Sequence, residues 1–450
     1  MNRITLSAGA AAALRRLEEQ GFEAYAVGGC VRDALLGRTP HDWDLTTSAL
    51  PEETAACFGD CRVIETGIRH GTVTVLLGGE ALEITTYRRD GAYADNRHPV
   101  EVTFSRTLSD DLSRRDFTVN AMAYHPERGL VDLFGGLSDL RAGVIRCVGD
   151  PRTRFEEDGL RILRAVRFAS ALDFSIAEET ASQVHACRAL LNNIARERVR
   201  EELNRLLCGR RAAGILREFT DVALQIMPEL APCVGFAQNS RYHCYDVWEH
   251  TLHALAETSS PELLVRLAIL LHDIGKPATY TEDEKGGHFR GHAEISVQLA
   301  GQIMQRLRYD NATQESVKKL VRMHDFPLKA ELRQVKRLLQ KLTEHELYCL
   351  LEVARCDRLA HAPGYDIPSP ALAQIPLLVE QIRAEGACLS LKTLAVKGDD
   401  LLALGLRPGP QMGALLRALL DAVVDGRLPN EKTALLEAAR STPTEQPTQH

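Results

Sequence analysis

The pattern of apolar positions divides the chain into a β-rich first part and a helical remainder. Residues 5–20 predict an amphipathic helix, because their apolar side chains recur at helical spacing (Leu6, Ala10, Leu14 and Leu17). From residue 25 to about 124 the pattern favours strands, with 71–77 and 81–87 as neighbours around Gly78 and Gly79. After Gly136 helical periodicity continues to the end. The sequence therefore predicts an α+β fold, with a mixed β-sheet and helices first and all-helical parts after it.

The run Tyr25–Asp44 combines a short apolar strand, a glycine turn, an amphipathic helical segment and a second strand. The second strand carries Asp42 and Asp44, and alternation along a strand points both carboxylates at one face. Two hard oxygen ligands beside Gly28-Gly29, whose backbone can approach phosphates closely, suit Mg²⁺ and a nucleoside triphosphate. Glu83, on a predicted strand of the same sheet, is either a third acid beside this pair or a solvated edge residue.

Two arginine-containing motifs follow the β-rich part. Ser113-Arg-Arg-Asp116 precedes an apolar segment, and Arg115 suits phosphate because a guanidinium can bind phosphate oxygens bidentately. In residues 155–168 an acid and three arginines recur every three residues along a predicted helix: Asp158, Arg161, Arg164 and Arg167. Spacing alone is equally typical of a surface helix covered by salt bridges.

Together these motifs resemble the class II tRNA nucleotidyltransferases, the CCA-adding enzymes and their sister bacterial poly(A) polymerases. The resemblance covers about residues 20–210 and resumes near the C-terminus. It implies a polymerase-β-like nucleotidyltransferase head in which Asp42 and Asp44 are catalytic and hold Mg²⁺. It also implies that the remaining motif residues bind the nucleotide: Gly28, Gly29, Arg32, Arg115, Asp158, Arg161, Arg164 and Arg167. Among these, Asp158 and Arg161 would select the base, and Arg164 and Arg167 would contact the triphosphate or the RNA end.

The activity that the resemblance implies is template-independent addition of C, C and A to tRNA 3′ ends, with tRNA, CTP and ATP as partners. Residues 63–75 have the Gly-Thr form typical of CCA-adding members, where poly(A) polymerases tend to show Gly-Arg-Arg-Phe. The polar, turn-rich loop 88–99 has the full length that enzymes restricted to CC addition lack. A poly(A) polymerase or an A-adding tRNA nucleotidyltransferase is the alternative within the family.

Several of the fifteen histidines follow a second pattern. His250, the adjacent pair His272-Asp273 and Asp357 occur in the order typical of HD phosphohydrolases, which this segment resembles. The resemblance implies a metal site made by these four residues, with His292 and His324 available for a second metal. Imidazole and carboxylate ligands suit Mn²⁺, Ni²⁺, Co²⁺, Fe or Mg²⁺, and a water bound to such an ion becomes nucleophilic.

The chemistry implied for the HD segment is cleavage of small phosphoesters, 2′,3′-cyclic phosphates among them, and thus end repair of tRNA. One alternative is a degenerate domain that only helps to bind tRNA. Another, from a different class, is a metal phosphohydrolase whose N-terminal half recruits RNA. The complete set of acidic and arginine motifs in the N-terminal half argues against the latter, because recruitment needs no metal carboxylates.

Composition and charge narrow the remaining classes. A net charge of −7 excludes a uniformly basic nucleic-acid binder, although residues 141–211, with fourteen Arg against ten acidic residues, leave room for a local basic surface. No apolar run approaches the roughly 18 residues of a membrane span, and no signal-peptide pattern is present. The eleven cysteines are scattered without a paired zinc spacing, which favours reduced thiols and a cytoplasmic protein with no membrane partner.

The motifs predict five segments along the chain. They are a nucleotidyltransferase head at 1–140, a helical neck for base and RNA binding at 141–215, an HD domain at 216–365, a helical tRNA-binding tail at 366–440 and a disordered end at 441–450.

Overall fold

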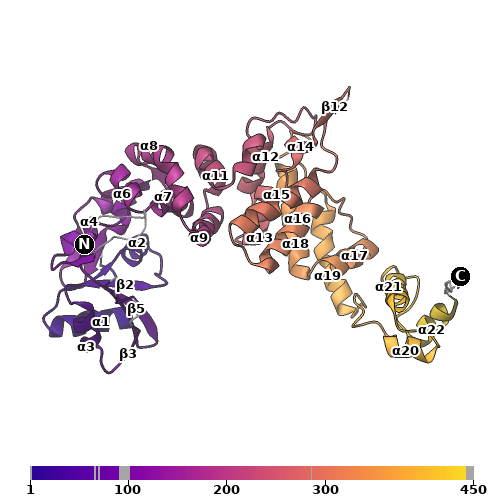
Figure 1. Ribbon diagram of the computed structural model, residues 1–450, viewed down its shortest axis with the longest axis horizontal. Helices are drawn as coiled ribbons and strands as arrows, with labels where there is room; N and C mark the ends of the chain where they lie inside the picture. The colour runs from indigo at the N-terminus through magenta and orange to yellow at the C-terminus, as the bar shows by residue number, and fades with distance from the viewer. Residues whose placement is uncertain (1–2, 65–66, 69–70, 91–101, 285, 442–450) are drawn as a thin grey trace. The chain divides into compact units, whose positions relative to one another are not determined.

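The computed structural model describes residues 3–64, 67–68, 71–90, 102–284 and 286–441. The chain forms two compact units, and each is described by itself. The first comprises residues 1–231 with 303–309, and the second comprises 232–302 with 310–450 (Figure 1). Of the predicted segments, the polar loop beyond residue 90 and the end beyond residue 441 lie outside the described residues.

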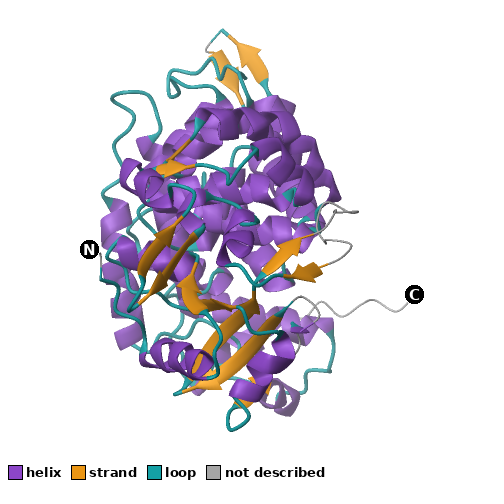
Figure 2. Ribbon diagram, turned by 90° about the vertical axis from the view of Figure 1, so that its left-hand side faces the viewer, coloured by secondary structure: helices purple, strands orange, loops and turns teal. Residues whose placement is uncertain are grey.

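A mixed β-sheet, whose strands are orange in Figure 2, organises the first unit. Its strand order is β3-β4-β5-β2-β1-β8-β9. The strands are β1 (Ala24–Val27), β2 (Trp43–Thr47), β3 (Arg62–Ile64), β4 (Thr72–Leu77), β5 (Glu80–Thr86), β8 (Met122–His125) and β9 (Gly129–Asp132). All neighbours are antiparallel except β2 and β5, which run parallel. The mixed sheet expected from the sequence is confirmed.

Helices around this sheet begin and end where the sequence supplies caps and apolar faces. They are α1 (Ala8–Glu19), α2 (Gly29–Leu35), α3 (Pro51–Cys57), α4 (Leu108–Ser113), η2 (Thr118–Asn120) and α5 (Gly136–Ala142). Helix α1 confirms the predicted amphipathic helix: the Ser7 hydroxyl accepts from the Ala10 backbone N–H, and Ala13, Leu14 and Leu17 are buried. A separate antiparallel ribbon is formed by β6 (Arg88–Asp90) and β7 (Val102–Phe104).

The rest of the first unit is nearly all helical. Its elements are α6 (Pro151–Glu157), α7 (Leu160–Leu172), α8 (Glu178–Cys187), η3 (Arg188–Asn193), α9 (Arg196–Leu207), α10 (Ala212–Glu218), α11 (Thr220–Ile226) and η4 (Pro228–Cys233). Two differences from the expected pattern occur. A two-residue parallel pairing joins β10 (Val144–Ile145) to β11 (Ser175–Ile176), and Asp158 interrupts the helix predicted over 155–168.

The second unit is built from helices with one short hairpin, β12 (Thr281–Asp283) and β13 (Gly286–His288). Its helices are α12 (Val247–Glu257), α13 (Leu263–Leu271), α14 (Lys276–Thr279), α15 (His292–Arg306), α16 (Asn311–Met323), α17 (Leu332–Lys341), α18 (Glu344–Leu359), α19 (Ala371–Ala384), α20 (Gly398–Ala403), α21 (Pro410–Val424) and α22 (Lys432–Ser441). Helices α12, α13, α16 and α18 pack on one another. Residues 388–439 form a small apolar core of their own.

The sequence also predicted reduced cysteines and no membrane span. All eleven cysteines are free thiols. Within the described ranges, no helix has both the length and the apolar composition needed to cross a membrane.

Candidate active sites

Three carboxylates gather at the start of β2. Asp44 lies on β2 directly opposite Glu83 of the parallel strand β5, so both side chains point to the same face, while Trp43 is buried on the other. Asp42 directly precedes the strand. Burial raises the pKa of Asp44, and the neighbouring Glu83 and Asp42 carboxylates raise it further against the opposing charge of Arg115. The structure thus places Glu83 beside Asp42 and Asp44, as a third acid rather than a residue at the edge of the sheet.

The donor chemistry of these carboxylates fits a hard cation. Mutual repulsion of like charges is relieved when a divalent ion is shared between them, and Mg²⁺ prefers oxygen ligands. Their oxygens are spread more widely than ligands around one ion, because no acid cluster of the described head brings three ligand atoms within 4.8 Å of one another.

A glycine turn brings an arginine to the same place. Gly28 ends β1 with φ +83° and donates its N–H to the Met122 carbonyl at 3.1 Å. A Cβ at Gly28 would lie 2.9 Å from Arg115 Nη1, and the positive φ is a conformation that other residues rarely adopt, so glycine suits this turn beside the guanidinium. Gly29 follows as the first residue of α2, and a Cβ added there would lie 3.7 Å from Arg32 Nη2, an ordinary contact distance.

Arg115 is held at one side and open at the other. Its Nη2 lies 3.0 Å from Asp111, a fully buried acid that also binds Arg114 at 2.7 Å. Burial alone would raise the pKa of Asp111, but the two guanidinium groups outweigh it and keep the pKa below its usual range. The Arg115 Nε is buried and makes no hydrogen bond. This donor has no partner among the described residues, and a guanidinium is a type of group that binds phosphate oxygens.

Arg32 and Arg164 belong to one polar network. Arg32 Nη1 donates to the Asn120 side chain at 2.6 Å, and Asn120 Nδ2 donates to Asp116 at 3.2 Å. Arg164 donates to the other oxygen of Asp116 through Nε at 2.8 Å and Nη2 at 2.5 Å. The network links the sheet end of the first unit to α7. Any contact of these two arginines with nucleotide or RNA stays a prediction.

Arg167 points into a different environment. Its Nε lies 2.8 Å from Glu202 on α9, and both side chains are about nine-tenths buried. Its guanidinium also lies over the Phe168 ring, 3.5 Å from the centroid. These contacts favour a structural role between α7 and α9, and the nucleotide contact expected from the sequence stays an untested prediction.

The two residues expected to select the base lie at the break between α6 and α7. Asp158 has extended backbone angles, φ −137° and ψ 104°, so it does not continue the arginine row on α7. One Asp158 oxygen accepts from the Leu160 N–H at 3.0 Å and the other from Arg198 Nη2 at 3.3 Å. Arg161 Nη1 lies 2.5 Å from Glu157, and its Nη2 donates to the Arg114 carbonyl at 3.0 Å. Arg161 therefore connects the break between α6 and α7 to the Arg114-Arg115 segment.

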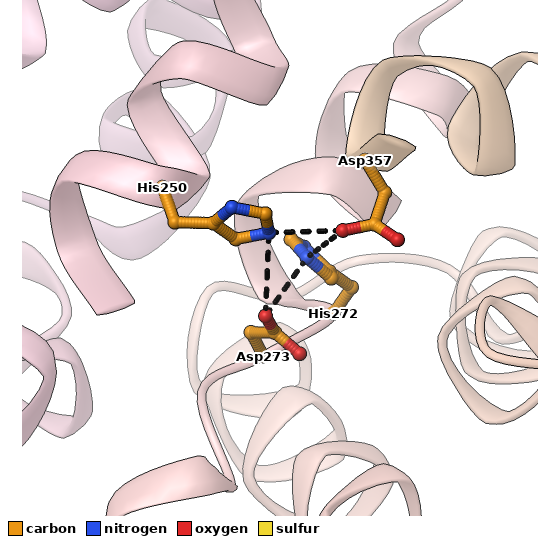
Figure 3. Close-up of side chains that lie close together, drawn as sticks. All are labelled: His250, His272, Asp273 and Asp357. Atoms are coloured by element: carbon orange, nitrogen blue, oxygen red, sulfur yellow. Dashed lines mark hydrogen bonds and ion pairs between the residues drawn. The ribbon is translucent and has the colours of Figure 1, made fainter. Parts of the chain in front are cut away.

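The second unit brings together all six residues of the histidine pattern. His250 from α12, His272 and Asp273 after α13, and Asp357 from α18 form a first cluster, in which each histidine Nε2 faces carboxylate oxygens at 2.9–3.6 Å (Figure 3). The Oδ2 atom of Asp273 faces this cluster, and its Oδ1 atom faces a second cluster that contains His292 and His324. Its Oδ1 lies 3.4 Å from His292 Nε2 and 3.5 Å from His324 Nε2.

Hydrogen bonds fix how these imidazoles present themselves. The Nδ1 atoms of His250, His272, His292 and His324 face the backbone carbonyls of Ala360, Ile269, Phe289 and Val321 at 2.7–3.1 Å. A carbonyl can only accept, so each Nδ1 carries a proton, and Nε2 is the atom left to bind a metal ion when the imidazole is neutral. The Nε2 atoms of His292 and His324 lie 3.2 Å apart. The donor set thus fits metal cations.

The carboxylates around His272 favour its protonated form, so a proton competes with a metal ion for the imidazole. Burial lowers the pKa of His272, but Asp273 and Asp357 outweigh burial and raise it to about 10. The buried Nε2 makes no hydrogen bond. A metal ion bound at this cluster must displace that proton.

A pocket of about 640 Å³ opens over the two clusters. Its lining is rich in cations and aromatic groups: Arg241, Tyr242, His243, Lys276, Phe289, Arg290 and His361. Lys276 Nζ lies 2.6 Å from Asp273 Oδ2 and donates to Gln238 at 2.8 Å. Positive side chains around acids and imidazoles suit a small phosphoester.

Comparison with known proteins identifies the family. The chain matches the family models described as "Poly A polymerase head domain" over residues 24–146, "Probable RNA and SrmB- binding site of polymerase A" over 173–233, and tRNA nucleotidyltransferase domain 2 over 289–439. It is 36% identical over 430 residues to the CCA-adding enzyme of Lactobacillus delbrueckii subsp. bulgaricus, covering 94% of this chain and 95% of that protein. The chain belongs to the CCA-adding enzyme family. It is also 36% identical to the CCA-adding enzyme of Lactobacillus helveticus over 431 residues, 94% of each chain.

Solved structures agree with this membership. The CCA-adding enzyme of Bacillus stearothermophilus in complex with CTP is 29% identical and superimposes with a TM-score of 0.72 over 96% of this chain and 97% of that one. The Thermotoga maritima CCA-adding enzyme complexed with tRNA, at 22% identity and a TM-score of 0.58 over 96% and 94% of the chains, shows the shared fold. The expected family and fold class are confirmed, and members of the CCA-adding enzyme family are nucleotidyltransferases. None of these names refers to an HD domain.

Sequence reasoning missed several residues that complete the two sites. Asp111 lies four residues before Arg115, a helical spacing that signals its ion pair. Lys276 lies three residues after Asp273, a spacing that likewise predicts contact. Arg198 is forty residues from Asp158, and no local spacing indicates their pairing.

Proposed function

We propose that this protein adds C, C and A to tRNA 3′ ends from CTP and ATP, without a template and with release of pyrophosphate. The observation that carries the proposal is the face of β2 and β5 where Asp44 and Glu83 lie paired beside Asp42, with Arg115 over the Gly28 turn. Relatives named CCA-adding enzymes support it, as does the solved relative that contains CTP.

In the mechanism that these residues support, Asp42 and Asp44 would hold Mg²⁺, with Glu83 beside them. When bound, the cation supplies charge stabilisation for the triphosphate and lowers the pKa of the RNA 3′-hydroxyl. The Gly28 turn leaves room for phosphate oxygens against backbone, and Arg115 offers its buried Nε to them. No covalent nucleophile is required.

Base selection is assigned to Asp158 and Arg161. An ionised carboxylate only accepts hydrogen bonds, so Asp158 can receive the amino group of cytosine or adenine, and a guanidinium can donate to a ring nitrogen or carbonyl. Uracil and guanine present a carbonyl where the amino group should be, which leaves polar groups without partners. Two acceptor positions of Asp158 are taken by Leu160 and Arg198, and the others remain for a base.

The experiment that tests the metal role is alanine substitution at Asp42 or Asp44. Each change should lower incorporation of both CTP and ATP on the order of 10³-fold, because both nucleotides use one metal site. Asp60→Ala is the matched control, since Asp60 is an exposed head acid paired with Arg16. Retained incorporation of either nucleotide would remove these residues from the metal role. A poly(A) polymerase or A-adding enzyme remains the alternative, and it predicts incorporation of ATP alone.

A second activity is proposed for the histidine clusters: metal-dependent hydrolysis of phosphoesters, 2′,3′-cyclic phosphates included. The observation that favours it is Asp273, whose two oxygens face the Nε2 atoms of two separate groups of histidines. These groups would hold one or two ions of Mn²⁺, Ni²⁺, Co²⁺, Fe or Mg²⁺ and activate water for hydrolysis. The rival reading is a scaffold that only supports tRNA binding.

Changing His272 and Asp273 together to Ala should abolish phosphoesterase activity on 2′,3′-cyclic nucleotides while CCA addition with Mg²⁺ continues. His345→Ala, on the exposed surface of α18, is the control and should retain both activities. Lack of phosphoesterase activity in the unaltered protein with every one of these metals would favour the scaffold. Loss of CCA addition in a folded double variant would show that the two sites are coupled.

Three further assignments complete the proposal. The free cysteines support a cytoplasmic location. Residues 366–440, with a small core of their own, are proposed to bind tRNA. Full CCA addition rather than CC addition alone rests on the length of a loop that lies outside the described residues.

A further inference from the structure

Arg198 is an arginine that the functional motifs leave unassigned. It lies in the first turn of α9, and its Nη2 donates to Asp158 Oδ2 at 3.3 Å. Its other terminal nitrogen, Nη1, is buried and makes no hydrogen bond. The side chains of Arg198 and Asp158 are 28% and 18% exposed, so the pair is largely withdrawn from bulk water yet open to a ligand.

The helix that carries Arg198 is fixed to the helix that carries the arginine motif. Helix α9 packs along α7, and the buried ion pair of Arg167 with Glu202 and the hydrogen bond from Ser170 to the Leu206 carbonyl join them. The guanidinium of Arg198 therefore projects from a rigid support.

The chain around Asp158 is equally constrained. A Cβ at Gly159 would lie 3.1 Å from the Leu190 Cβ and 3.2 Å from the Leu190 carbonyl oxygen, so the break between α6 and α7 is pressed against η3. The Leu160 N–H holds one oxygen of Asp158. The rotation of the carboxylate is then set by what binds its second oxygen, and that partner is Arg198.

We propose that Arg198 is a positioning residue for nucleotide selection: it orients the Asp158 carboxylate so that its free lone pairs face the base. This inference rests on the proposed role of Asp158. Two fixed donors, one on each oxygen, leave the carboxylate a single orientation. A buried nitrogen without a partner costs free energy, and its presence beside the selecting acid fits a place that receives a further acceptor when ligand binds.

Loss of the hydrogen bond between Arg198 and Asp158 should weaken discrimination between nucleotides in two ways. A carboxylate free to rotate no longer meets the amino group of cytosine or adenine reliably. It also no longer places two acceptors opposite the carbonyl O4 of uracil, which is the repulsive element of the selection. The effect should fall on the ratio between nucleotides rather than on the rate with all of them.

The test is Arg198→Gln, with Arg198→Lys as the conservative variant and Arg205→Gln as the control. Arg205 is an exposed arginine of the same helix. On tRNA lacking CCA, the ratio of kcat/KM for CTP to that for UTP should fall about 10- to 100-fold in Arg198→Gln, the range of one charge-assisted hydrogen bond. Arg198→Lys keeps the positive charge but lacks the planar group of nitrogens, so its CTP-to-UTP ratio should lie between those of Arg198→Gln and the unaltered protein. Arg205→Gln should keep the ratio of the unaltered protein.

Each outcome decides the question. An unchanged ratio in a folded Arg198→Gln protein would overturn the inference, as would an equal loss with both nucleotides. Should Arg198→Gln turn over too slowly, the same ratio taken from equilibrium binding of CTP and UTP replaces the kinetic one. If the unaltered protein does not prefer CTP to UTP, the proposed function fails; if Asp158→Ala loses the preference and Arg198→Gln keeps it, only this inference fails.

Discussion

Replacing Asp116 by Asn tests whether the polar network at the end of the sheet stabilises the first unit. Asp116 is 8% exposed, and its two oxygens accept four hydrogen bonds, two from Arg164 and one each from the Phe117 N–H and Asn120. The side-chain NH2 of an Asn at this position would face other hydrogen-bond donors in either orientation, those of Arg164 or those of Phe117 and Asn120. It also leaves the Arg164 charge without its partner.

The expected loss of unfolding free energy is about 2–4 kcal/mol. Breaking a buried ion pair costs roughly 3–5 kcal/mol, and the value is reduced here because the Arg164 side chain is 34% exposed. Arg164→Gln should cost a similar amount, and the double variant much less than the sum. Glu156→Gln is the control, since its pair with Arg152 is exposed and should contribute little to the free energy of unfolding.

The assay uses the two tryptophans of the chain, which lie in different units. Trp43 is in β2 of the first unit and Trp248 in α12 of the second, so Trp248→Phe leaves a reporter for the first unit alone. In that background, urea unfolding followed by fluorescence should show a midpoint lowered by about 1 M or more for Asp116→Asn. A shift no larger than that of Glu156→Gln would refute the reasoning.

The same network gives a pH dependence with a definite sign. Burial would raise the pKa of Asp116, but the Arg164 charge and the hydrogen bonds from Arg164 and Asn120 hold it well below its usual range. A carboxyl with a lowered folded-state pKa stabilises fully above its unfolded pKa, about 3.9, and loses that contribution as the pH falls further. The difference between the native protein and Asp116→Asn should therefore be constant from pH 7 to 5 and shrink below pH 4.

Three further predictions concern the two candidate sites. Gly28→Ala should destabilise the first unit by about 1 kcal/mol, because φ +83° is strained for Ala. It should also raise KM for both CTP and ATP, because the added Cβ would displace Arg115; KM values equal to those of the unaltered protein would contradict this. Metal binding to the histidine clusters should release protons and be tighter at pH 8 than at pH 6, as calorimetry in buffers of different ionisation enthalpy can measure, because the His272 proton must leave. His292→Ala should halve a metal stoichiometry of two, measured by inductively coupled plasma analysis, and leave it unchanged if only the first cluster binds.

The motifs of the first unit could be found in the sequence because their residues sit at short spacings. Alternation along a strand predicted Asp42 and Asp44 on one face; in the structure Asp44 lies on β2 and Asp42 directly precedes the strand. The convergence of His250, His272 and Asp273 was expected from their order along the chain, and the helices α12, α13 and α18 bring them together.

What sequence reasoning could not supply depends on contacts between distant segments. The row from Asp158 to Arg167 predicted one continuous helix, but Asp158 adopts an extended conformation and Gly159 packs closely against η3. Arg167 looks like its neighbours in the motif, yet Glu202, thirty-five residues away, buries its charge. No periodicity within the motif carries information about α9, so neither this pair nor the hold of Arg198 on Asp158 could be predicted.

The measurement that tests the central claim most directly is the length of the product made on defined tRNAs. A tRNA lacking the whole CCA end, one lacking only the terminal A and a complete tRNA are each incubated with CTP, with ATP and with both. The account predicts two added residues with CTP alone and three with both nucleotides on the first, one added residue with ATP on the second, and none on the third. Addition of A from ATP alone to the first or the third tRNA, or of long A tracts to any of the three, would contradict it.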